Sequence, residues 1–230
     1  MTNLCEYPDV PTSNTEGISE CFDRCSCAKA QRAHPEALRG VSRVLLDLLD
    51  RRGLGGQSVL EAGCGFGGLS LAAVGRGAIR ATGLDLSPVA VREATRLAHE
   101  ARLAERVTFA VGDAAQVQLP PSDLVVLDKV MCCYPAVDAL LQNTVSATGA
   151  MYAFAVPFSS GLRGLLARLA FWFENVFRWI RRQAFRAYVH DVKRIEARLA
   201  TAGFERVASA RRAIWYVALH QRTGKTADPS

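Results

Sequence analysis

The sequence lacks the features that mark membrane-spanning and secreted proteins. Its 230 residues contain no uninterrupted apolar run of about 18 residues or more, the length that a transmembrane helix needs. The first twenty residues are polar, without the apolar segment of a secretory signal peptide. Seven scattered cysteines are an odd number and do not suggest a disulfide framework. We therefore expect a cytoplasmic protein whose thiols are reduced.

No internal repeat is visible, and the length suits one domain, or one domain with a small cap. Half of the residues are hydrophobic, which is enough for a full core. We expect a flexible arm over residues 1–34, a folded domain over residues 35–220 and a disordered tail over residues 221–230. Nothing in the sequence indicates an oligomeric state.

Positive charge is concentrated late in the chain. The formal net charge is +6 at pH 7, and ten basic side chains lie between residues 178 and 212. Such a cluster can meet nucleic acid, anionic lipid or an acidic small molecule. A solvated basic face is an equal alternative.

Segments of strand and helix character alternate through most of the chain, which predicts a parallel, doubly wound sheet. Five segments read as buried strands: residues 58–63, 80–87, 106–114, 123–130 and 149–157. One of the helices between them has Ser87 as its N-cap and Pro88 in its first turn. A first helix is expected over residues 35–51.

The end of the chain departs from this alternation. After a helix that stops at Gly203, residues 205–222 read as two successive strands with no helix between them. A closing antiparallel hairpin is predicted. The predicted fold class is therefore α/β: a doubly wound, mostly parallel seven-stranded sheet with a C-terminal antiparallel hairpin.

Residues 158–189 form an insertion that is longer than a usual connection and has apolar residues at helical spacing. After the fifth strand, this helical cap would lie over the carboxyl ends of the strands, where ligands bind in such sheets. Its large aromatic side chains are too many for a free surface. We expect the helix over residues 162–182 to cover an apolar substrate pocket, with Trp172 contacting the substrate. Contact with a membrane surface is the alternative.

The stretch VLEAGCGFGG fits two glycine patterns, and Gly63 and Gly65 belong to both. With Gly68 they give the G-x-G-x-x-G of dinucleotide sites. With Glu61 and Gly67 they give the acidic residue and G-x-G-x-G of S-adenosylmethionine sites. In either case a glycine loop between a strand and a helix lets the backbone approach a ligand closely.

Acidic residues at successive strand ends favour the second pattern. Asp85 ends the second strand, 22 residues after Gly63, where a carboxylate accepts both ribose hydroxyls of either cofactor. Glu61 stands where dehydrogenases usually carry an apolar residue, and its charge suits the positively charged methionine end of S-adenosylmethionine. Asp113 at the end of the third strand suits an adenine amino group, and Asp128 lies at the end of the fourth.

With these motifs the chain resembles the class I S-adenosylmethionine-dependent methyltransferases over roughly residues 35–220. The match is looser to small-molecule methyltransferases of the magnesium-protoporphyrin and quinone-precursor type. The resemblance implies that the methionine end, the ribose and the adenine each meet residues of this chain. The residues so implied are Glu61, Gly63, Gly65, Gly67, Asp85, Leu86, Asp113, Ala114 and Asp128.

The acceptor side carries weaker signals. The segment VMCCYP lacks the Asn/Asp-Pro-Pro-aromatic pattern of nucleic-acid amino-methyltransferases, so we expect no nucleic-acid substrate. Its Tyr134 is expected to line the substrate pocket, while Cys132 and Cys133 read as packing residues. His190 precedes the last crossover helix, and its imidazole can accept a proton near neutral pH. We expect His190 to be a general base, with a helix-capping role as the alternative.

A metal site is not expected. Cys21, Cys25 and Cys27 give C-x-x-x-C-x-C, one residue short of the iron–sulfur signature of radical S-adenosylmethionine enzymes. A zinc site that adds Cys5 is an alternative.

The sequence as a whole predicts an S-adenosylmethionine-dependent methyltransferase that acts on a small, aromatic or lipophilic acceptor. Two alternatives remain open: an NAD-linked oxidoreductase, and a non-catalytic module with a vestigial cofactor fold that binds a membrane or a partner.

Overall fold

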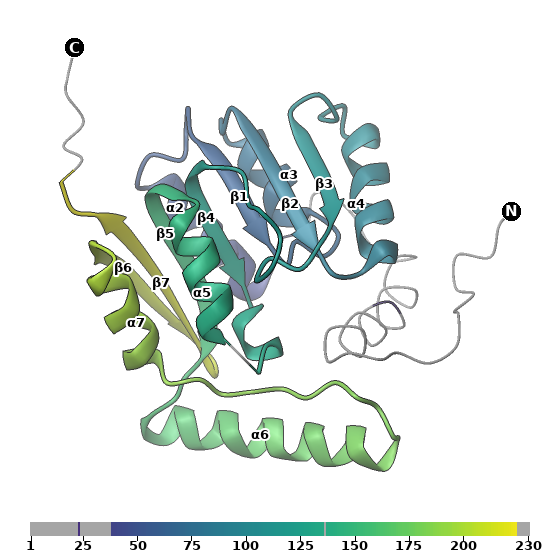
Figure 1. The fold of residues 1–230 in the computed structure, drawn as a ribbon, viewed down its shortest axis with the longest axis vertical. Helices are drawn as coiled ribbons and strands as arrows, with labels where there is room; N and C mark the ends of the chain where they lie inside the picture. Colours follow the sequence, from purple (N-terminus) through teal and green to yellow (C-terminus); the bar gives the residue numbers. More distant parts are fainter. Residues whose placement is uncertain (1–22, 24–37, 136, 225–230) are drawn as a thin grey trace, which may run out of the picture.

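The computed structural model describes residue 23 and residues 38–135 and 137–224. One sheet has the strand order β3-β2-β1-β4-β5-β7-β6 (Figure 1). Its strands are β1 (Ser58–Ala62), β2 (Arg80–Asp85), β3 (Val107–Val111), β4 (Ser122–Asp128), β5 (Thr148–Pro157), β6 (Phe204–Arg212) and β7 (Trp215–Arg222). The helices are α2 (Gly40–Asp50), α3 (Gly68–Gly75), α4 (Pro88–Glu100), α5 (Val137–Ser146), α6 (Gly161–Ile180) and α7 (Val192–Thr201), with a 3-10 turn η1 (Met131–Cys133).

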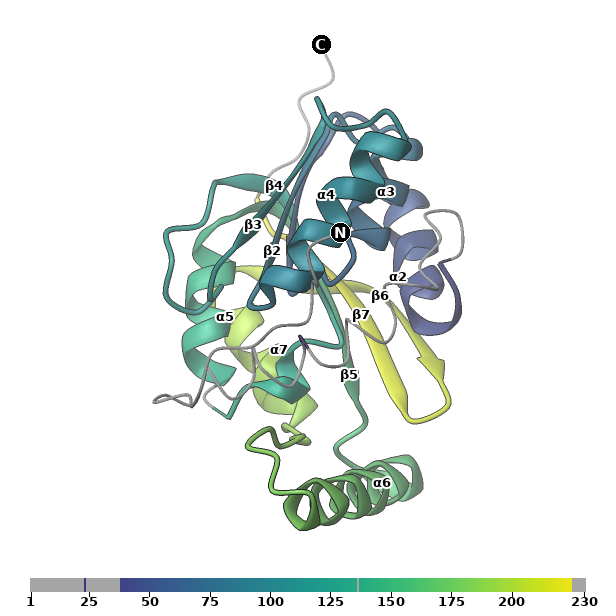
Figure 2. The ribbon, with the colours of Figure 1, turned by 90° about the vertical axis from the view of Figure 1, so that its right-hand side faces the viewer.

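The predicted fold class is confirmed. Strands β1 to β5 run parallel, whereas β7 pairs antiparallel with both β5 and β6. Helices α2, α3 and α4 cover one face of the sheet, and α5 and α7 cover the other (Figures 1 and 2). Because both faces are covered, β1 is buried along its whole length, and a continuous apolar strand is the sequence expected there.

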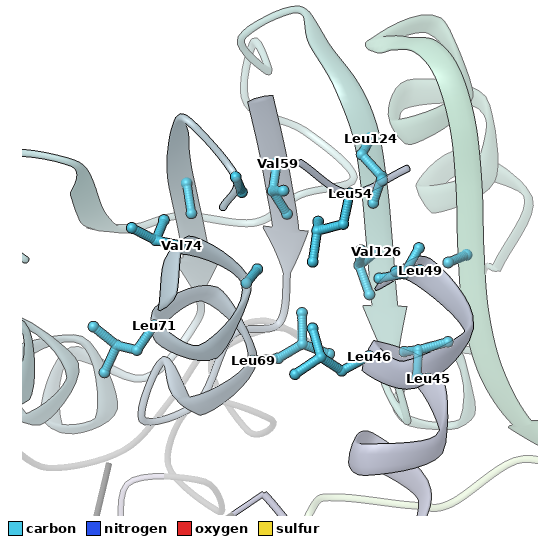
Figure 3. Close-up of a cluster of buried hydrophobic side chains, with 14 of the residues drawn as sticks. Leu45, Leu46, Leu49, Leu54, Val59, Leu69, Leu71, Val74, Leu124 and Val126 are labelled. Carbon is cyan, nitrogen blue, oxygen red and sulfur yellow. The ribbon is translucent and has the colours of Figure 1, made fainter. Parts of the chain in front are cut away.

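The core beside the glycine loop is built by leucines from two helices and by valines from the central strands (Figure 3). Leu45 and Leu49 of α2 are fully buried, as is Leu124 of β4. Each such side chain contributes roughly 1.5–3 kcal/mol by leaving water. This packing fixes α2 and α3 against the sheet, and so fixes the loop that joins β1 to α3.

The start of α4 follows the sequence prediction. The side chain of Ser87 caps the helix by accepting a hydrogen bond of 3.0 Å from the backbone N–H of Ala90, and Pro88 is the first helical residue. Asp23 accepts hydrogen bonds from the hydroxyl of Ser87 and the N–H of Val89, so it adds a second cap to the same turn.

Two predicted boundaries shift at the ends of the domain. The described part of the first helix begins at Gly40, and residues 35–37 lie outside the described residues, as does nearly all of the predicted arm. The tail was expected from residue 221, yet β7 continues to Arg222. Arg222 pairs with Phe204 of β6, and its side chain donates hydrogen bonds to the carbonyls of Thr148 and Gly149, at 2.6 and 3.0 Å.

Helix α6 lies across the end of the molecule beyond the carboxyl ends of the parallel strands (Figures 1 and 2). The predicted insertion is therefore a single helix followed by an extended segment, residues 183–190, that returns to α7. Among the described residues no helix combines the length and the apolar character that crossing a membrane requires.

Candidate cofactor and acceptor site

A cavity of about 530 Å³ lies at the carboxyl ends of β1, β2 and β4. Most of the predicted site residues reach its wall. Those that line it are Glu61, Gly63, Gly65, Asp85, Leu86, Ala114, Asp128 and Tyr134. Gly67, Asp113, Trp172 and His190 do not line it, although Gly67 and Asp113 shape segments that do.

The glycine loop needs glycine for two separate reasons. Gly63 has a φ of 73°, and a Cβ placed on it would lie 2.3 Å from a methyl carbon of Val130. Gly67 has a φ of 72°, and a Cβ there would lie 2.2 Å from the ring of Phe109. Both positions combine a left-handed backbone with a close neighbour, so no other residue fits without strain.

Hydrogen bonds fasten this loop to the end of β2. The backbone N–H groups of Gly63 and Cys64 both donate to the carbonyl of Leu84, at 2.7 and 2.9 Å. The N–H of Gly65 donates to a carboxylate oxygen of Asp85 at 2.8 Å. The two strand ends are thereby locked together at one edge of the sheet.

Asp85 is held by its own turn as well as by the glycine loop. Its second carboxylate oxygen accepts a hydrogen bond of 2.9 Å from the N–H of Ser87. Burial raises the pKa of the Asp85 carboxyl, and the hydrogen bonds from Ser87 and Gly65 oppose that shift. The carboxylate is thus oriented before any ligand arrives, and each oxygen retains lone pairs for hydroxyl donors.

Glu61 is buried beneath the cavity, and sequence reasoning missed its partner. Its carboxylate accepts hydrogen bonds from the N–H and the hydroxyl of Ser70 in α3, at 3.0 and 2.6 Å. Burial raises the pKa of Glu61 to about 8, with smaller contributions from the charges of Asp128 and Asp85. A positively charged group in the cavity would favour ionisation of this carboxyl.

The loop after β3 is fastened by side chains from other elements. Asp113 caps its own turn by accepting from the N–H of Ala115 at 2.9 Å, and it also accepts a hydrogen bond of 3.0 Å from the hydroxyl of Tyr134. Asn143 of α5 donates to the carbonyls of Ala114 and Val117, at 2.9 and 2.8 Å. Tyr134 and Asn143 therefore both hold the loop that carries Ala114, a residue of the cavity wall.

Asp128 belongs to a three-residue polar cluster that the sequence did not reveal. One of its oxygens accepts a hydrogen bond from the hydroxyl of Ser42 in α2 and lies 3.1 Å from the ammonium nitrogen of Lys129. Lys129 in turn donates to the Ser42 hydroxyl at 2.9 Å. The other oxygen of Asp128 is buried without a hydrogen-bond partner in the described part of the chain. All three residues line the cavity.

The described cysteines are reduced thiols. Cys64, Cys132 and Cys133 are free, and the sulfur atoms of the adjacent pair are 4.0 Å apart. The hydrogen bond with Cys132 and burial raise the pKa of Cys133. No metal-binding group of three or more ligands occurs among residues 38–135 and 137–224. The cysteines of the iron–sulfur or zinc alternative lie outside the described residues.

His190 lies beside the cavity wall rather than in it. Its Nε2 is 2.8 Å from the carbonyl oxygen of Tyr134, and because a carbonyl can only accept, Nε2 carries the proton. Its ring stacks on that of Tyr188. The general-base role of His190 stays a prediction. Because Nε2 donates to the Tyr134 carbonyl, Nδ1 would be the nitrogen that accepts the proton. The contact in this structure instead positions the Tyr134 backbone.

The cap covers the cavity differently from the expectation. Trp172 is 58% exposed on α6 and does not line the cavity. The part that meets the site is the returning segment, where buried Phe185 packs against Leu86 and Cys133. From α6 itself, Arg178 reaches the cavity wall. A role for Trp172 in acceptor binding would require α6 to move.

Comparison with known proteins agrees with this geometry. Residues 59–148 match a family described as a methyltransferase domain. The ribosomal protein L11 methyltransferase of Laribacter hongkongensis (strain HLHK9) is 42% identical over 86 residues, or 37% of this chain and 26% of that protein. A probable chloroplastic tocopherol O-methyltransferase of Oryza sativa subsp. japonica is 38% identical over 64 residues, or 28% of this chain and 18% of that protein. The chain therefore spans about a quarter or less of the curated relatives it matches.

A solved structure extends the likeness of fold to nearly the whole chain. The magnesium protoporphyrin IX methyltransferase of Synechocystis PCC 6803, solved with bound S-adenosylmethionine, aligns with a TM-score of 0.66 at 19% identity. The alignment covers 94% of this chain and all of that one. At 19% identity, this likeness shows the fold alone. Taken with the matched methyltransferase domain and the glycine loop, it supports the resemblance to the class I S-adenosylmethionine-dependent methyltransferases.

Proposed function

We propose that this protein transfers a methyl group from S-adenosylmethionine to a small, aromatic or lipophilic acceptor. One observation carries the proposal. The cavity at the strand ends brings Glu61, Asp85 and Asp128 to one wall, and an oxygen of Asp128 is buried there without a partner. A cofactor with an ammonium and a sulfonium group would favour the ionised form of these carboxyls.

The residues at the site fit such a cofactor. Gly65 has a φ of 52°, and a Cβ placed on it would meet no atom within 4 Å, so its backbone borders open space. Asp85 is oriented to accept the ribose hydroxyls, and Leu86 and Ala114 offer apolar contacts for a base. The cofactor, when bound, supplies an activated methyl group with a sulfide as its leaving group. The task left to the chain is to align the acceptor and to exclude water.

The cavity provides few groups that could remove a proton from the acceptor. Burial, with the charge of Asp113, raises the pKa of Tyr134, so this phenol keeps its proton near neutral pH. The raised pKa of Cys133 has the same consequence for its thiol. Both side chains can donate hydrogen bonds, but they are poor bases. Because these side chains can donate but not accept a proton, the cavity suits an acceptor atom that is already ionised when it binds.

The acceptor side combines apolar and cationic groups. Leu38, Phe66 and Val130 line the cavity together with Lys129 and Arg178. This composition favours a lipophilic molecule that carries an acidic group. The names of the tocopherol and magnesium protoporphyrin methyltransferases support a small-molecule acceptor, whereas that of the ribosomal protein L11 methyltransferase gives a protein. The expected cytoplasmic location stays a prediction.

Calorimetric titration with S-adenosylhomocysteine and, separately, with NAD tests the cofactor. We expect binding of the first and none of the second. Binding of NAD alone would favour the oxidoreductase alternative. Mass spectrometry of ligands that co-purify with the protein, followed by turnover of the identified compound with labelled S-adenosylmethionine, tests the acceptor. Cofactor binding without turnover of any such compound would favour the non-catalytic alternative.

A further inference from the structure

Helix α6 exposes an apolar surface that the methyl-transfer site does not use. Nine of the eleven exposed large apolar side chains of the described residues belong to this one helix. They range from 46% exposed for Leu169 to 73% exposed for Leu162. They are Leu162, Leu165, Leu166, Leu169, Trp172, Phe173, Phe177, Trp179 and Ile180. Contiguous exposure of this kind marks a contact surface.

Several polar side chains of α6 hydrogen-bond to the body of the protein while its large apolar side chains are exposed, which reverses the usual arrangement of a surface helix. Arg163 donates to the carbonyl of Ala213 at 2.9 Å near one end of the helix. Near the other end, Asn175 exchanges two hydrogen bonds of 2.8 Å with the backbone of Ala187. Gly164 lets the helix approach the backbone of Ser159, since a Cβ there would lie 2.7 Å from its carbonyl carbon. These contacts hold α6 along the body with its apolar face turned outward.

The charges around this face indicate what covers it. Residues 161–182 contain five arginines and a single acidic residue, Glu174, which pairs with Arg178 at 2.7 Å. Arg163, Arg168, Arg181 and Arg182 are exposed at the edges and the end of the apolar face. A second copy of the chain docked on this face would bring two cationic rims together, which is unfavourable. A surface with negative headgroups above an apolar layer complements both parts.

We propose that α6 is a docking helix that lies in the interface of an anionic lipid membrane, with its nine apolar side chains in the acyl boundary and its four exposed arginines, Arg163, Arg168, Arg181 and Arg182, at the headgroups. The helix projects beyond the strand ends, and its inward-facing Arg178 lines the cavity. Docking would therefore bring the cavity close to the membrane. The docking itself does not depend on the proposed function, but a lipophilic acceptor would reach the cavity directly from the lipid.

Vesicle flotation of the full chain tests this proposal. We expect binding to vesicles of phosphatidylcholine mixed with phosphatidylglycerol and much weaker binding to phosphatidylcholine alone. The variant Phe173→Glu/Trp179→Glu should bind the anionic vesicles at least about tenfold more weakly. The matched control Ile79→Glu changes an apolar side chain that is 49% exposed and lies outside α6, so it should bind like the unmodified protein. Arg181→Gln/Arg182→Gln should weaken binding to the anionic vesicles and leave the weak binding to phosphatidylcholine unchanged.

Calorimetry with S-adenosylhomocysteine on the same variants keeps the two proposals separable. Unchanged cofactor affinity in Phe173→Glu/Trp179→Glu shows that the loss lies in docking and not in folding or in the cofactor site. Failure of the unmodified chain to bind either vesicle overturns the docking proposal, whatever the cofactor result. A stable dimer in sedimentation that Phe173→Glu/Trp179→Glu dissociates overturns it as well, in favour of a second copy. Equal binding of neutral and anionic vesicles overturns the role given to the arginines.

Discussion

The hydroxyl of Tyr134 donates a hydrogen bond of 3.0 Å to the carboxylate of Asp113, and so ties the segment after β4 to the turn after β3. Tyr134 also lines the cavity, so one side chain links the cavity wall to the loop that carries Ala114. We expect a change at Tyr134 to reach, through this bond, the turn that the resemblance assigns to the adenine.

Tyr134→Phe removes that bond and little volume. We expect S-adenosylhomocysteine to bind about threefold to tenfold more weakly, because an ordinary hydrogen bond contributes about 1 kcal/mol. Calorimetry measures the change, and Tyr188→Phe, which alters a ring outside the cavity wall, serves as the control. Equal affinities in the two variants would show that the bond does not shape the cofactor site.

Asp85→Ala removes a carboxylate that is already oriented by Gly65 and Ser87. We expect at least about a tenfold loss of S-adenosylhomocysteine affinity with the fold intact, because charge-assisted hydrogen bonds contribute about 1.5–3 kcal/mol each. Asp47→Ala is the control, since Asp47 pairs with Arg43 and Arg76 away from the cavity. If calorimetry finds no difference between the variants, the ribose assignment is wrong.

Gly63→Ala places a methyl group 2.3 Å from Val130 on a left-handed backbone. We expect roughly 1–3 kcal/mol of lost stability and much weaker cofactor binding, because the loop must move to relieve the contact. Gly55→Ala, where an added Cβ meets no atom within 4 Å, should change stability by less than about 1 kcal/mol. Val130→Ala should partly rescue Gly63→Ala in urea unfolding. Absence of any rescue would place the cost in the backbone conformation alone.

Glu61→Gln should change how stability depends on pH. Burial raises the pKa of Glu61 to about 8 from an ordinary 4.5, so the folded protein holds this proton where the unfolded chain has lost it. Stability present below the ordinary pKa is therefore lost as the pH rises to about 8, by at most roughly 1.4 kcal/mol per pH unit. Relative to Glu61→Gln, the unmodified protein should lose unfolding free energy between about pH 5 and pH 8. Parallel curves in denaturant titrations would contradict the shifted pKa.

His190 offers a test between positioning and base catalysis. We expect His190→Gln to keep turnover within about tenfold, because a glutamine amide can donate to the Tyr134 carbonyl as Nε2 does. His190→Ala should lose more, since no donor remains. Turnover is measured with the acceptor identified from co-purified ligands. Losses of about a hundredfold or more in both variants, with the pH profile altered, would instead support the general base predicted from the sequence.

Much of the fold could be predicted because it depends on local pattern. The alternation of strand and helix, the N-cap at Ser87 and the paired strands at the end of the chain are written in neighbouring residues, and the sheet follows from them. Parallel strands end at one edge, so Glu61, Asp85 and Asp128 were expected to lie together, and they do.

The partners of those residues could not be predicted in the same way. Ser42 and Ser70 are ordinary helix residues in the sequence, and only the packing of α2 and α3 on the sheet brings their hydroxyls to Asp128 and Glu61. Asn143 has no local signal for the loop that it holds. Contacts between segments far apart in the chain depend on how helices and strands pack together. The spacing of apolar residues in the sequence carries no information about that packing.

The helix over residues 161–180 shows the division most clearly. The sequence by itself determined that a long helix forms after β5 and that its apolar residues share one face, because both follow from a period of 3.6 residues. Which way that face points was decided by tertiary structure. Arg163 and Asn175 find backbone partners on the body, and these hydrogen bonds turn the apolar face outward, away from the cavity that it was expected to cover.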